Sequence, residues 1–147
     1  MEKVLYSKNF NKNADCNIWS VFPNCYSFAM SSLGYLWMFK AIDEKDNVNV
    51  ERIYTDTEKT HIKSEDVDAM SFSFSFDLDF INIFKILEKY NIPLLSKERS
   101  ENNPLVFGGG PVLTANPVPY KDFFDFIIIG DGENVNTTVV DIIAEMK

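Results

Sequence analysis

The sequence predicts an α/β domain built on a doubly wound parallel sheet of about five strands. Residues 105–107 and 126–129 are short, unbroken apolar runs, which are typical of strands covered on both faces. Strand-like segments also alternate with segments whose apolar residues recur every three or four positions. Because this alternation implies parallel strands joined by right-handed crossovers, we predict the strand order 2-1-3-4-5.

The first strand is predicted at residues 18–22 and ends at a Pro-Asn pair, since proline cannot donate a hydrogen bond to a ladder. A helix is predicted from a start between residues 27 and 31 to about residue 44. Its core-facing stripe is expected, from the spacing, to be Met30, Leu33, Leu36, Trp37 and Ala41. Gly34 in this helix costs about 1 kcal/mol relative to alanine, so we expect it to contact the sheet or a bound group closely.

The second strand, predicted at residues 48–54, alternates apolar and polar residues, which suits the edge of a sheet. A charged connection follows at residues 56–68 and contains His61, the only histidine of the sequence. His61 has charged and polar neighbours and no apolar pattern around it. We therefore expect a solvated loop histidine and not a ligand of cobalt or another metal.

The third strand is predicted at residues 69–76, where serine and phenylalanine alternate with a period of two. Small hydroxyl side chains on one face allow a helix or a ligand to lie close to the backbone. We expect helix packing at Ser71, and ligand contact at Ser73 and Ser75 because they lie nearer the carboxyl end of the strand. Asp79 is predicted to cap the next helix, which ends before Pro93.

The stretch from residue 105 to residue 133 is predicted to form the functional site. Its two strands end in Gly108-Gly109-Gly110-Pro111 and in Gly130-Asp131-Gly132-Glu133, and a loop with Asn116-Pro117 and a helical turn at about residues 120–124 lies between them. Glycines at strand ends let a ligand approach the backbone, and ligands of open α/β sheets bind at the carboxyl ends of the strands. A final helix is predicted at residues 134–146.

Twelve residues are predicted to bind a cofactor or substrate at this edge of the sheet. They are Asn24, Tyr26, Ser31, Ser73, Ser75, Gly109, Gly110, Pro111, Asn116, Gly130, Gly132 and Glu133. For Glu133, an alternative is that its carboxylate only stabilises its own helix, and acidic residues at that helix start would repel a ligand phosphate. No catalytic residue is predicted, because no serine, cysteine or lysine stands beside a plausible base.

Composition excludes several classes of partner. The formal charge of −8 and the presence of only two arginines argue against nucleic acid as a partner. No apolar run is long enough to span a bilayer and no signal peptide is recognisable, so a cytoplasmic protein without membrane association is expected. A length of 147 residues predicts one domain, residues 1–147.

The two cysteines, Cys16 and Cys25, flank the first predicted strand. An extended segment of this length holds them more than about 20 Å apart, which is too far for a disulfide. No Cys-x-x-Cys spacing is present, so neither a metal site nor an iron–sulfur cluster is predicted.

Several motifs, kept in order along the chain, resemble the N-terminal region of radical S-adenosylmethionine (SAM) proteins that contain a cobalamin-binding domain, a group of Fe-S oxidoreductases. The motifs are Phe22-Pro23-Asn24-Cys25-Tyr26, Met30-Ser31-Ser32-Leu33-Gly34, Glu51-Arg52, Phe72-Ser73, Asn82, Ile92-Pro93, Glu98-Arg99, Gly109-Gly110-Pro111, Asn116-Pro117, Asp125 and Ile129-Gly130-Asp131-Gly132-Glu133. The resemblance implies a flavodoxin-like, cobalamin-binding-type domain that precedes a barrel with an iron–sulfur cluster and SAM. The three-cysteine motif of that barrel is not present here, so we expect an N-terminal fragment that does not act as an enzyme alone.

Two functions remain open after the resemblance. One is a module that binds a corrin or a substrate at the carboxyl edge of the sheet. The other is a degenerate scaffold that binds no cofactor and packs against the absent barrel of the same polypeptide, with self-association of the isolated domain as a consequence. Related domains that ligate cobalt use an Asp-x-His-x-x-Gly loop, and this chain has Asn24-Cys25-Tyr26-Ser27-Phe28 in that place. Any bound cobalamin would therefore lack a protein histidine ligand.

Overall fold

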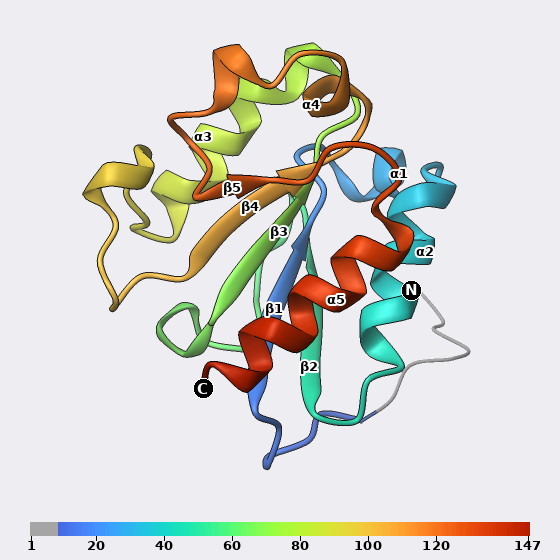
Figure 1. Cartoon of the computed structure of the whole chain (residues 1–147), viewed down its shortest axis with the longest axis vertical. Helices are drawn as coiled ribbons and strands as arrows, with labels where there is room; N and C mark the ends of the chain where they lie inside the picture. The colour runs from blue at the N-terminus through green and yellow to red at the C-terminus, as the bar shows by residue number, and fades with distance from the viewer. Residues whose placement is uncertain (1–8) are drawn as a thin grey trace.

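The computed structural model of the protein describes residues 9–147, apart from the side chain of Glu133. Its centre is a sheet of parallel strands in the order β2-β1-β3-β4-β5 (Figure 1), which confirms the predicted flavodoxin-like α/β fold and strand order. The strands are β1 Cys16–Val21, β2 Val48–Ile53, β3 Ala69–Ser73, β4 Leu105–Gly109 and β5 Phe126–Ile127. As predicted, β2 lies at an edge.

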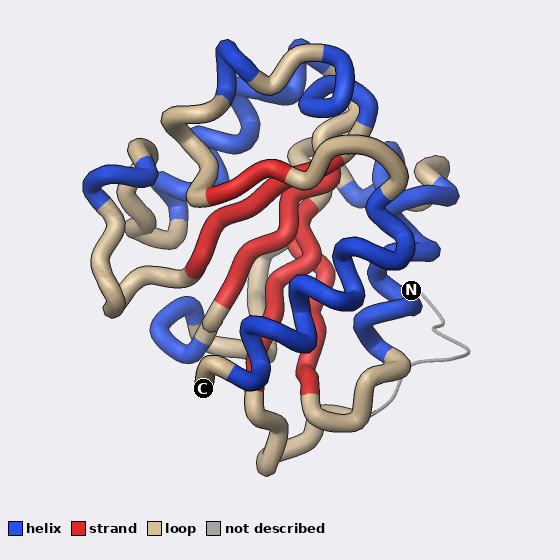
Figure 2. Tube along the Cα trace, in the orientation of Figure 1, coloured by secondary structure: helices blue, strands red, loops and turns tan. Residues whose placement is uncertain are grey.

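Helices cover both faces of the sheet (Figure 2). They are α1 Tyr26–Ala29, α2 Leu33–Asp43, α3 Phe80–Lys89, α4 Pro111–Ala115 and α5 Gly132–Glu145, and short 3-10 turns lie at Ser64–Asp66, Asp77–Asp79, Ser96–Glu98 and Val118–Tyr120. None of the helices found within residues 9–147 has the length and apolar character needed to cross a membrane.

Two larger apolar clusters, one on each face of the sheet, form most of the core. On one face, Ile42 of α2 and Val140 and Ile143 of α5 pack over Ile18 and Phe107 of the sheet. On the other face, α3 and α4 cover alternate residues of the same strands, including Trp19, Met70 and Phe72. The central strands are thus buried on both sides, which explains the unbroken apolar run at residues 105–107.

The helix predicted from about residue 27 is in fact two helices, α1 and α2. Ser31 ends the first because its Oγ donates a hydrogen bond to the carbonyl oxygen of Phe28 at 2.7 Å. Ser32 begins the second, since its Oγ accepts a hydrogen bond from the backbone N–H of Tyr35 at 3.4 Å. Serine side chains compete with the backbone in this way, which favours a break at a Ser-Ser pair.

The predicted core face of α2 was wrong. Leu33 and Trp37 are exposed, at 79% and 53% of their maximum area, whereas Tyr35 and Ile42 are buried. Residues of α2 are apolar on nearly every side, so the sequence spacing fitted two alternative faces. The expected close contact of Gly34 with the sheet is not formed, because a Cβ atom built there meets no atom within 4 Å, while contact with a bound group stays a prediction.

The predicted side-chain cap of Asp79 is not formed. Asp79 occupies the N-cap position of α3, but its carboxylate makes no hydrogen bond to the first turn of the helix. It accepts a hydrogen bond from Asn24 instead. The remaining boundaries of α3 agree with the prediction, and Asn91, with φ of 57°, follows its end.

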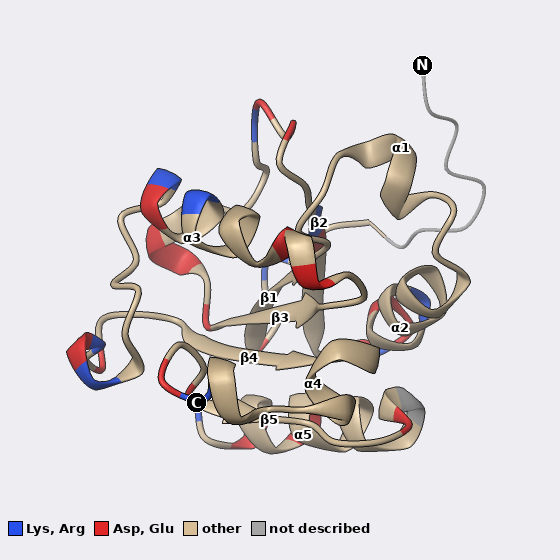
Figure 3. Ribbon diagram, turned by 90° about the horizontal axis from the view of Figure 1, so that it is seen from above, with Lys and Arg blue, Asp and Glu red and all other residues tan. Residues whose placement is uncertain are grey.

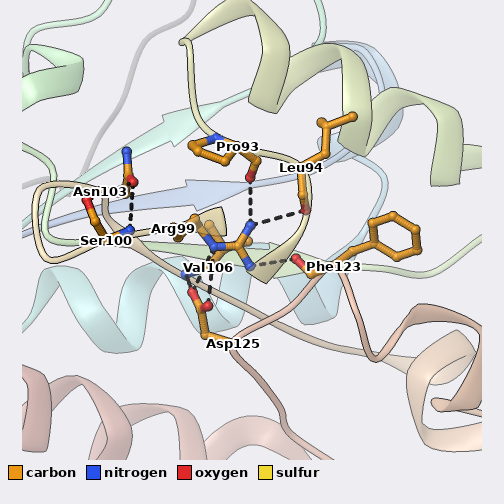
Figure 4. A network of polar contacts seen from close by, with 8 residues as sticks. All are labelled: Pro93, Leu94, Arg99, Ser100, Asn103, Val106, Phe123 and Asp125. Atoms are coloured by element: carbon orange, nitrogen blue, oxygen red, sulfur yellow. Dashed lines mark hydrogen bonds and ion pairs between the residues drawn. The ribbon is translucent and has the colours of Figure 1, made fainter. Parts of the chain in front are cut away.

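Arg99 joins three segments beside the sheet (Figure 4). Its guanidinium donates to the carbonyl oxygens of Pro93 and Phe123, each at 2.8 Å, and its Nε lies 3.1 Å from Oδ2 of Asp125. The same Oδ2 accepts from the backbone N–H of Val106 at 2.7 Å. Burial lowers the pKa of Arg99, and the neighbouring carboxylate of Asp125 opposes that shift. Two residues of the resemblance motifs, Arg99 and Asp125, therefore have a structural role.

Candidate functional site

A pocket of about 640 Å³ lies at the carboxyl ends of β3 and β4, on the face of the sheet that α2 and α5 cover. We call it the edge pocket. It is lined by Ser32, Gly34, Tyr35, Met38, Ser71, Phe72, Ser73, Ser75, Phe107, Gly109, Gly110, Pro111, Thr114, Ala115, Ile128, Gly130, Asp131, Gly132 and Asn136.

Seven of the twelve predicted site residues line the edge pocket. They are Ser73, Ser75, Gly109, Gly110, Pro111, Gly130 and Gly132. Ser73 and Gly109 are paired in the register of β3 and β4, so the small side chains of two neighbouring strands meet there. The glycine-marked strand ends of residues 105–133 are thus brought together, while ligand binding by these residues stays a prediction.

Four other predicted residues do not line this pocket, and each has a partner elsewhere. Asn24 binds Asp79, and Ser31 binds the carbonyl of Phe28. The ring of Tyr26 packs edge-on against Tyr54 with 5.6 Å between centroids. Oδ1 of Asn116 accepts the backbone N–H of Val118 at 3.2 Å, which shapes the turn after α4. For Glu133, the prediction concerns a side chain outside the described part of the structure.

Gly110 shapes the floor of the edge pocket and cannot be replaced without strain. Its φ is +115°, a conformation that other residues rarely adopt. A Cβ atom at this position would lie 2.5 Å from the carbonyl oxygen of Phe74. The close approach lets the chain turn directly from β4 into α4, a short helix that the sequence pattern did not predict, with Pro111 in its first position.

The helices contribute the side walls, which the sequence-based predictions missed. Tyr35 and Met38 come from α2, and Asn136 comes from α5. The hydroxyl of Tyr35 donates to the carbonyl oxygen of Ser20 at 3.0 Å. Burial, followed by the proximity of Tyr54, raises the pKa of Tyr35, so its hydroxyl remains a proton donor to Ser20.

Asn136 is a polar residue of the edge pocket whose bonding is incomplete. It is only 5% exposed, and its Oδ1 is buried with no hydrogen-bond partner. Buried polar atoms nearly always have a partner, because an unpaired one carries a desolvation cost. The sequence carried a signal for Asn136. This residue precedes Val140 and Ile143 by four and seven positions, so it is a polar residue within the buried apolar stripe of α5.

Charge around the edge pocket is sparse and negative. Among the described side chains that line it, Asp131 is the charged one. Figure 3 shows neither acidic nor basic residues along α4 and β5, and Asp131 is the N-cap residue of α5. The described lining residues therefore offer no cation to a bound phosphate group.

Outside this pocket, Asp79 is a second buried polar residue with incomplete bonding. It is 5% exposed, its Oδ1 accepts from Nδ2 of Asn24 at 2.8 Å, and its Oδ2 has no partner. Burial raises the pKa of Asp79, and the hydrogen bond from Asn24 acts in the opposite direction. Asn82 completes the connection by donating to the carbonyl oxygen of Pro23 at 3.0 Å.

His61 lies on an exposed connection, and the two cysteines are free thiols. As predicted, His61 is exposed on the connection after β2, where its Nδ1 lies 3.1 Å from Oε1 of Glu51. Cys16 and Cys25 are free, as predicted, and burial raises the pKa of the Cys16 thiol to about 12. Over residues 9–147, no three His, Cys, Asp or Glu side chains are grouped to hold a metal ion.

Comparison with known proteins identifies the family. The model of the family "Radical SAM proteins, N-terminal" matches residues 34–147, which is more than half of the chain. The chain is also 24% identical, over 119 residues, to the uncharacterized protein MJ0966 of Methanocaldococcus jannaschii. That match covers 80% of this chain and 24% of the relative, so the chain spans about a quarter of the relative's length. The radical SAM part of the resemblance is confirmed, and the chain belongs to the radical SAM N-terminal family.

Proposed function

We propose that this domain is a small-molecule-binding module of a radical SAM protein, with its ligand in the edge pocket. The observation that carries the proposal is the position of the pocket at the carboxyl ends of β3 and β4. Open α/β sheets bind their ligands at this edge, and small-molecule pockets commonly enclose roughly 300–1,000 Å³. The volume of about 640 Å³ falls in that range.

The lining offers several ways to hold a neutral organic molecule. Ser73, Ser75 and Thr114 bring hydroxyl groups, while Met38 and Ile128 bring apolar surface. Glycines at the strand ends expose backbone groups to a ligand. A pocket with mainly apolar walls and a few placed polar groups is the usual design of small-molecule sites.

A corrin is one candidate ligand for this module. The lining contains hydroxyl and amide groups but no imidazole or thiol. A cobalamin in this site would therefore be held through its peripheral amide groups or its nucleotide tail, and not through a protein ligand to cobalt. A substrate of the parent protein is the other candidate, and the same pocket would hold it.

The first test mixes the purified domain with hydroxocobalamin, removes free corrin on a desalting column and measures the visible spectrum. Retained corrin absorption and a raised melting temperature support the binding module. A colourless protein with an unchanged melting curve contradicts the corrin proposal and favours a scaffold function.

A pocket-filling variant shows whether retention depends on the edge pocket. Gly34 lines the pocket and an added Cβ atom meets no atom within 4 Å, so Gly34→Phe is the variant chosen to place a ring at the pocket wall. Gly34→Ala is the matched control, because it removes the same helix glycine without adding a ring. We expect Gly34→Phe to lose hydroxocobalamin and Gly34→Ala to keep it. Equal retention by both variants would place the corrin elsewhere.

A scaffold that packs against another part of the polypeptide is the second candidate function. Exposed apolar side chains follow the carboxyl ends of four strands: Phe28, Leu33, Phe76, Leu78, Ile81, Val118 and Ile129. Leu78 is 89% exposed. Apolar patches on one side of a domain mark docking surfaces, and a radical SAM barrel carrying the iron–sulfur cluster and SAM is the partner this candidate requires.

The scaffold function predicts that the isolated domain self-associates through these exposed apolar side chains. Light scattering after size-exclusion chromatography at rising concentration measures it. We expect dimers or larger species for the wild type and a shift towards monomer for a Leu33→Lys, Leu78→Lys double variant. Strict monomers at high concentration would count against the scaffold function.

A further inference from the structure

Ser71 lines the edge pocket, and its hydroxyl group has no hydrogen-bond partner within residues 9–147. We propose that Ser71 binds the polar group of the ligand, and that this group is an uncharged hydroxyl or amide on an otherwise apolar molecule. The inference rests on the proposed ligand-binding function and adds to it the ligand class and a residue that selects it.

The first step concerns the direction of the Ser71 side chain. Met70 and Phe72, its neighbours in β3, pack in the cluster under α3 and α4, whereas Ala69 packs under α2 and α5. Because successive side chains of a strand point to opposite faces, Ser71 shares the face of Ala69, which is the face of the pocket. Its backbone is paired with β1 on one side and with β4 on the other. The side chain is therefore the part of Ser71 that the pocket reaches.

The second step concerns the bonding of the hydroxyl group. Ser71 is only 7% exposed, and polar groups buried to this extent nearly always have a partner. Its hydroxyl makes no hydrogen bond to any described residue. Unlike Oδ1 of Asn136, however, this oxygen does not belong to the described side-chain atoms that are fully enclosed without a partner. The hydroxyl of Ser71 thus borders open space, and that space is the edge pocket.

The third step concerns the complementary group. A serine hydroxyl carries one O–H donor and two acceptor lone pairs. Ser73, two positions further along β3 and roughly 7 Å away, brings a second hydroxyl to the same face of the strand and to the same pocket. Ligand hydroxyl and amide groups also donate and accept, so they can satisfy these side chains in both directions.

The fourth step concerns charge. No Lys, Arg or His belongs to the described lining of the pocket, so an anion at Ser71 would have no counter-ion. Asp131, the N-cap residue of α5, lines the pocket and disfavours an anion further. Burying a charge without a partner costs far more than burying a hydrogen-bonded neutral group. An uncharged polar group is therefore the one that suits the buried hydroxyl of Ser71.

The fifth step concerns the body of the ligand. Phe107 is paired with Ser71 in the register of β3 and β4 and lines the pocket, so apolar surface adjoins the hydroxyl. Met38 and Ile128 add to this surface. A ring with one polar substituent matches such a lining. Benzyl alcohol, benzoate and benzylamine are suitable probes, because they share a ring and differ in carrying no charge, a negative charge or a positive charge.

The experiment titrates each probe into ¹⁵N-labelled protein at neutral pH and follows the two-dimensional amide spectrum. We expect benzyl alcohol to shift the backbone signals of Ser71, Ser73 and Gly109, which lie together at the pocket. Benzoate and benzylamine should bind at least about fivefold more weakly, since each would bring an unpaired charge to the serine hydroxyls.

Two variants test the role of the hydroxyl. Ser71→Ala should weaken benzyl alcohol about fivefold, which is the usual effect of losing one neutral hydrogen bond. Ser20→Ala is the matched control, because Ser20 is the register partner of Ser71 in β1 and is also buried but does not line the pocket. It should leave binding unchanged. Should Ser71→Ala disturb the overall spectrum, Ser71→Cys serves as the second variant, since a thiol is similar in shape and a weak donor.

The outcomes separate this inference from the proposed function. Tighter binding of benzoate or benzylamine, or unchanged binding of benzyl alcohol in Ser71→Ala, would overturn the inference and leave the binding module intact. Equal losses in Ser20→Ala and Ser71→Ala would overturn it as well. If benzyl alcohol shifts none of the three signals while hydroxocobalamin is retained, the inference fails alone. If no probe shifts these signals and hydroxocobalamin is not retained, both the inference and the proposed function fail.

Discussion

Asn24 donates a hydrogen bond of 2.8 Å from its side-chain Nδ2 to Oδ1 of Asp79, and this bond joins the loop after β1 to the start of α3. It explains two departures from the sequence-based predictions. Asp79 does not cap α3 with its side chain, and Asn24 does not line the edge pocket. The carboxylate oxygen of Asp79 that Asn24 does not reach is left buried and unpaired.

We expect Asp79→Asn to stabilise the domain at neutral pH. The substitution keeps a side-chain acceptor for Asn24 and removes a buried charge. Because burial raises the pKa of Asp79 above its ordinary value of 3.8, the folded state binds more protons than the unfolded state above that pH. Wild-type stability should therefore fall relative to the variant as pH rises from 3.8 through the raised pKa. Melting curves between about pH 4 and pH 8 measure the difference.

The control for this prediction is Asp77→Asn, which changes an exposed carboxylate two residues earlier. It should shift the melting temperature little at any pH, since surface substitutions usually stay within about 0.5 kcal/mol. A constant difference between Asp79→Asn and the wild type over the whole pH range would contradict the role given to the buried carboxylate.

Arg99→Met should destabilise the domain by about 3 kcal/mol. The side chain of Arg99 is only 4% exposed, and its loss leaves the carbonyl oxygens of Pro93 and Phe123 and the carboxylate of Asp125 without their donor. Urea denaturation followed by circular dichroism gives the free energy of unfolding.

Arg99→Lys is the informative companion of that variant. A lysine keeps the charge but has no planar fork, so it cannot reach both carbonyl groups and the carboxylate together. We expect it to recover less than half of the loss. Wild-type stability in Arg99→Lys would show that charge alone, and not the geometry of Figure 4, holds these segments together.

Gly110→Ala should destabilise the domain by at least about 2 kcal/mol, through backbone strain and a steric clash. The added Cβ atom would lie 2.5 Å from the carbonyl oxygen of Phe74 at a φ of +115°. The neighbouring Gly109→Ala is the matched control, because its Cβ would lie 3.6 Å from Ile128, an ordinary contact. Equal melting temperatures for the two variants would be incompatible with the described turn.

Asn136→Leu should stabilise the unliganded domain by about 1 kcal/mol, because it replaces a buried, unpaired amide with an apolar side chain of similar size. Asn134→Leu, at an exposed position of the same helix, is the control and should change stability by less than about 0.5 kcal/mol. A strong destabilisation by Asn136→Leu would indicate that its amide supports the fold.

The strands were well predicted because each is a short segment with its own pattern. The period of two at residues 69–76, of which residues 69–73 form β3, and the apolar runs before Gly108 and Gly130 depend on local sequence alone. The break between α1 and α2 was harder to predict, because it depends on which of several serines bonds to the backbone. The short helix α4 was missed since its five residues carry no period.

The residues of the candidate site were also predicted with unequal success. Its floor comes from strand ends marked by glycine, proline and serine, and these were recognised in the sequence. Its walls come from helices, where one residue in a turn faces the pocket, and the choice depends on how the helix is rotated against the sheet. Tyr35 and Asn136 were missed for that reason.

The sequence by itself determined the parallel α/β sheet, the order of its strands and the edge at which two glycine-ended strands meet, because alternation and strand ends are local properties of the chain. Only the tertiary structure decided which side of α2 is buried, that Asn24 binds Asp79, and that the amide of Asn136 is left unpaired beside the edge pocket. Those outcomes depend on packing between segments far apart in the sequence, and such packing selects one among several faces or partners that local patterns allow equally.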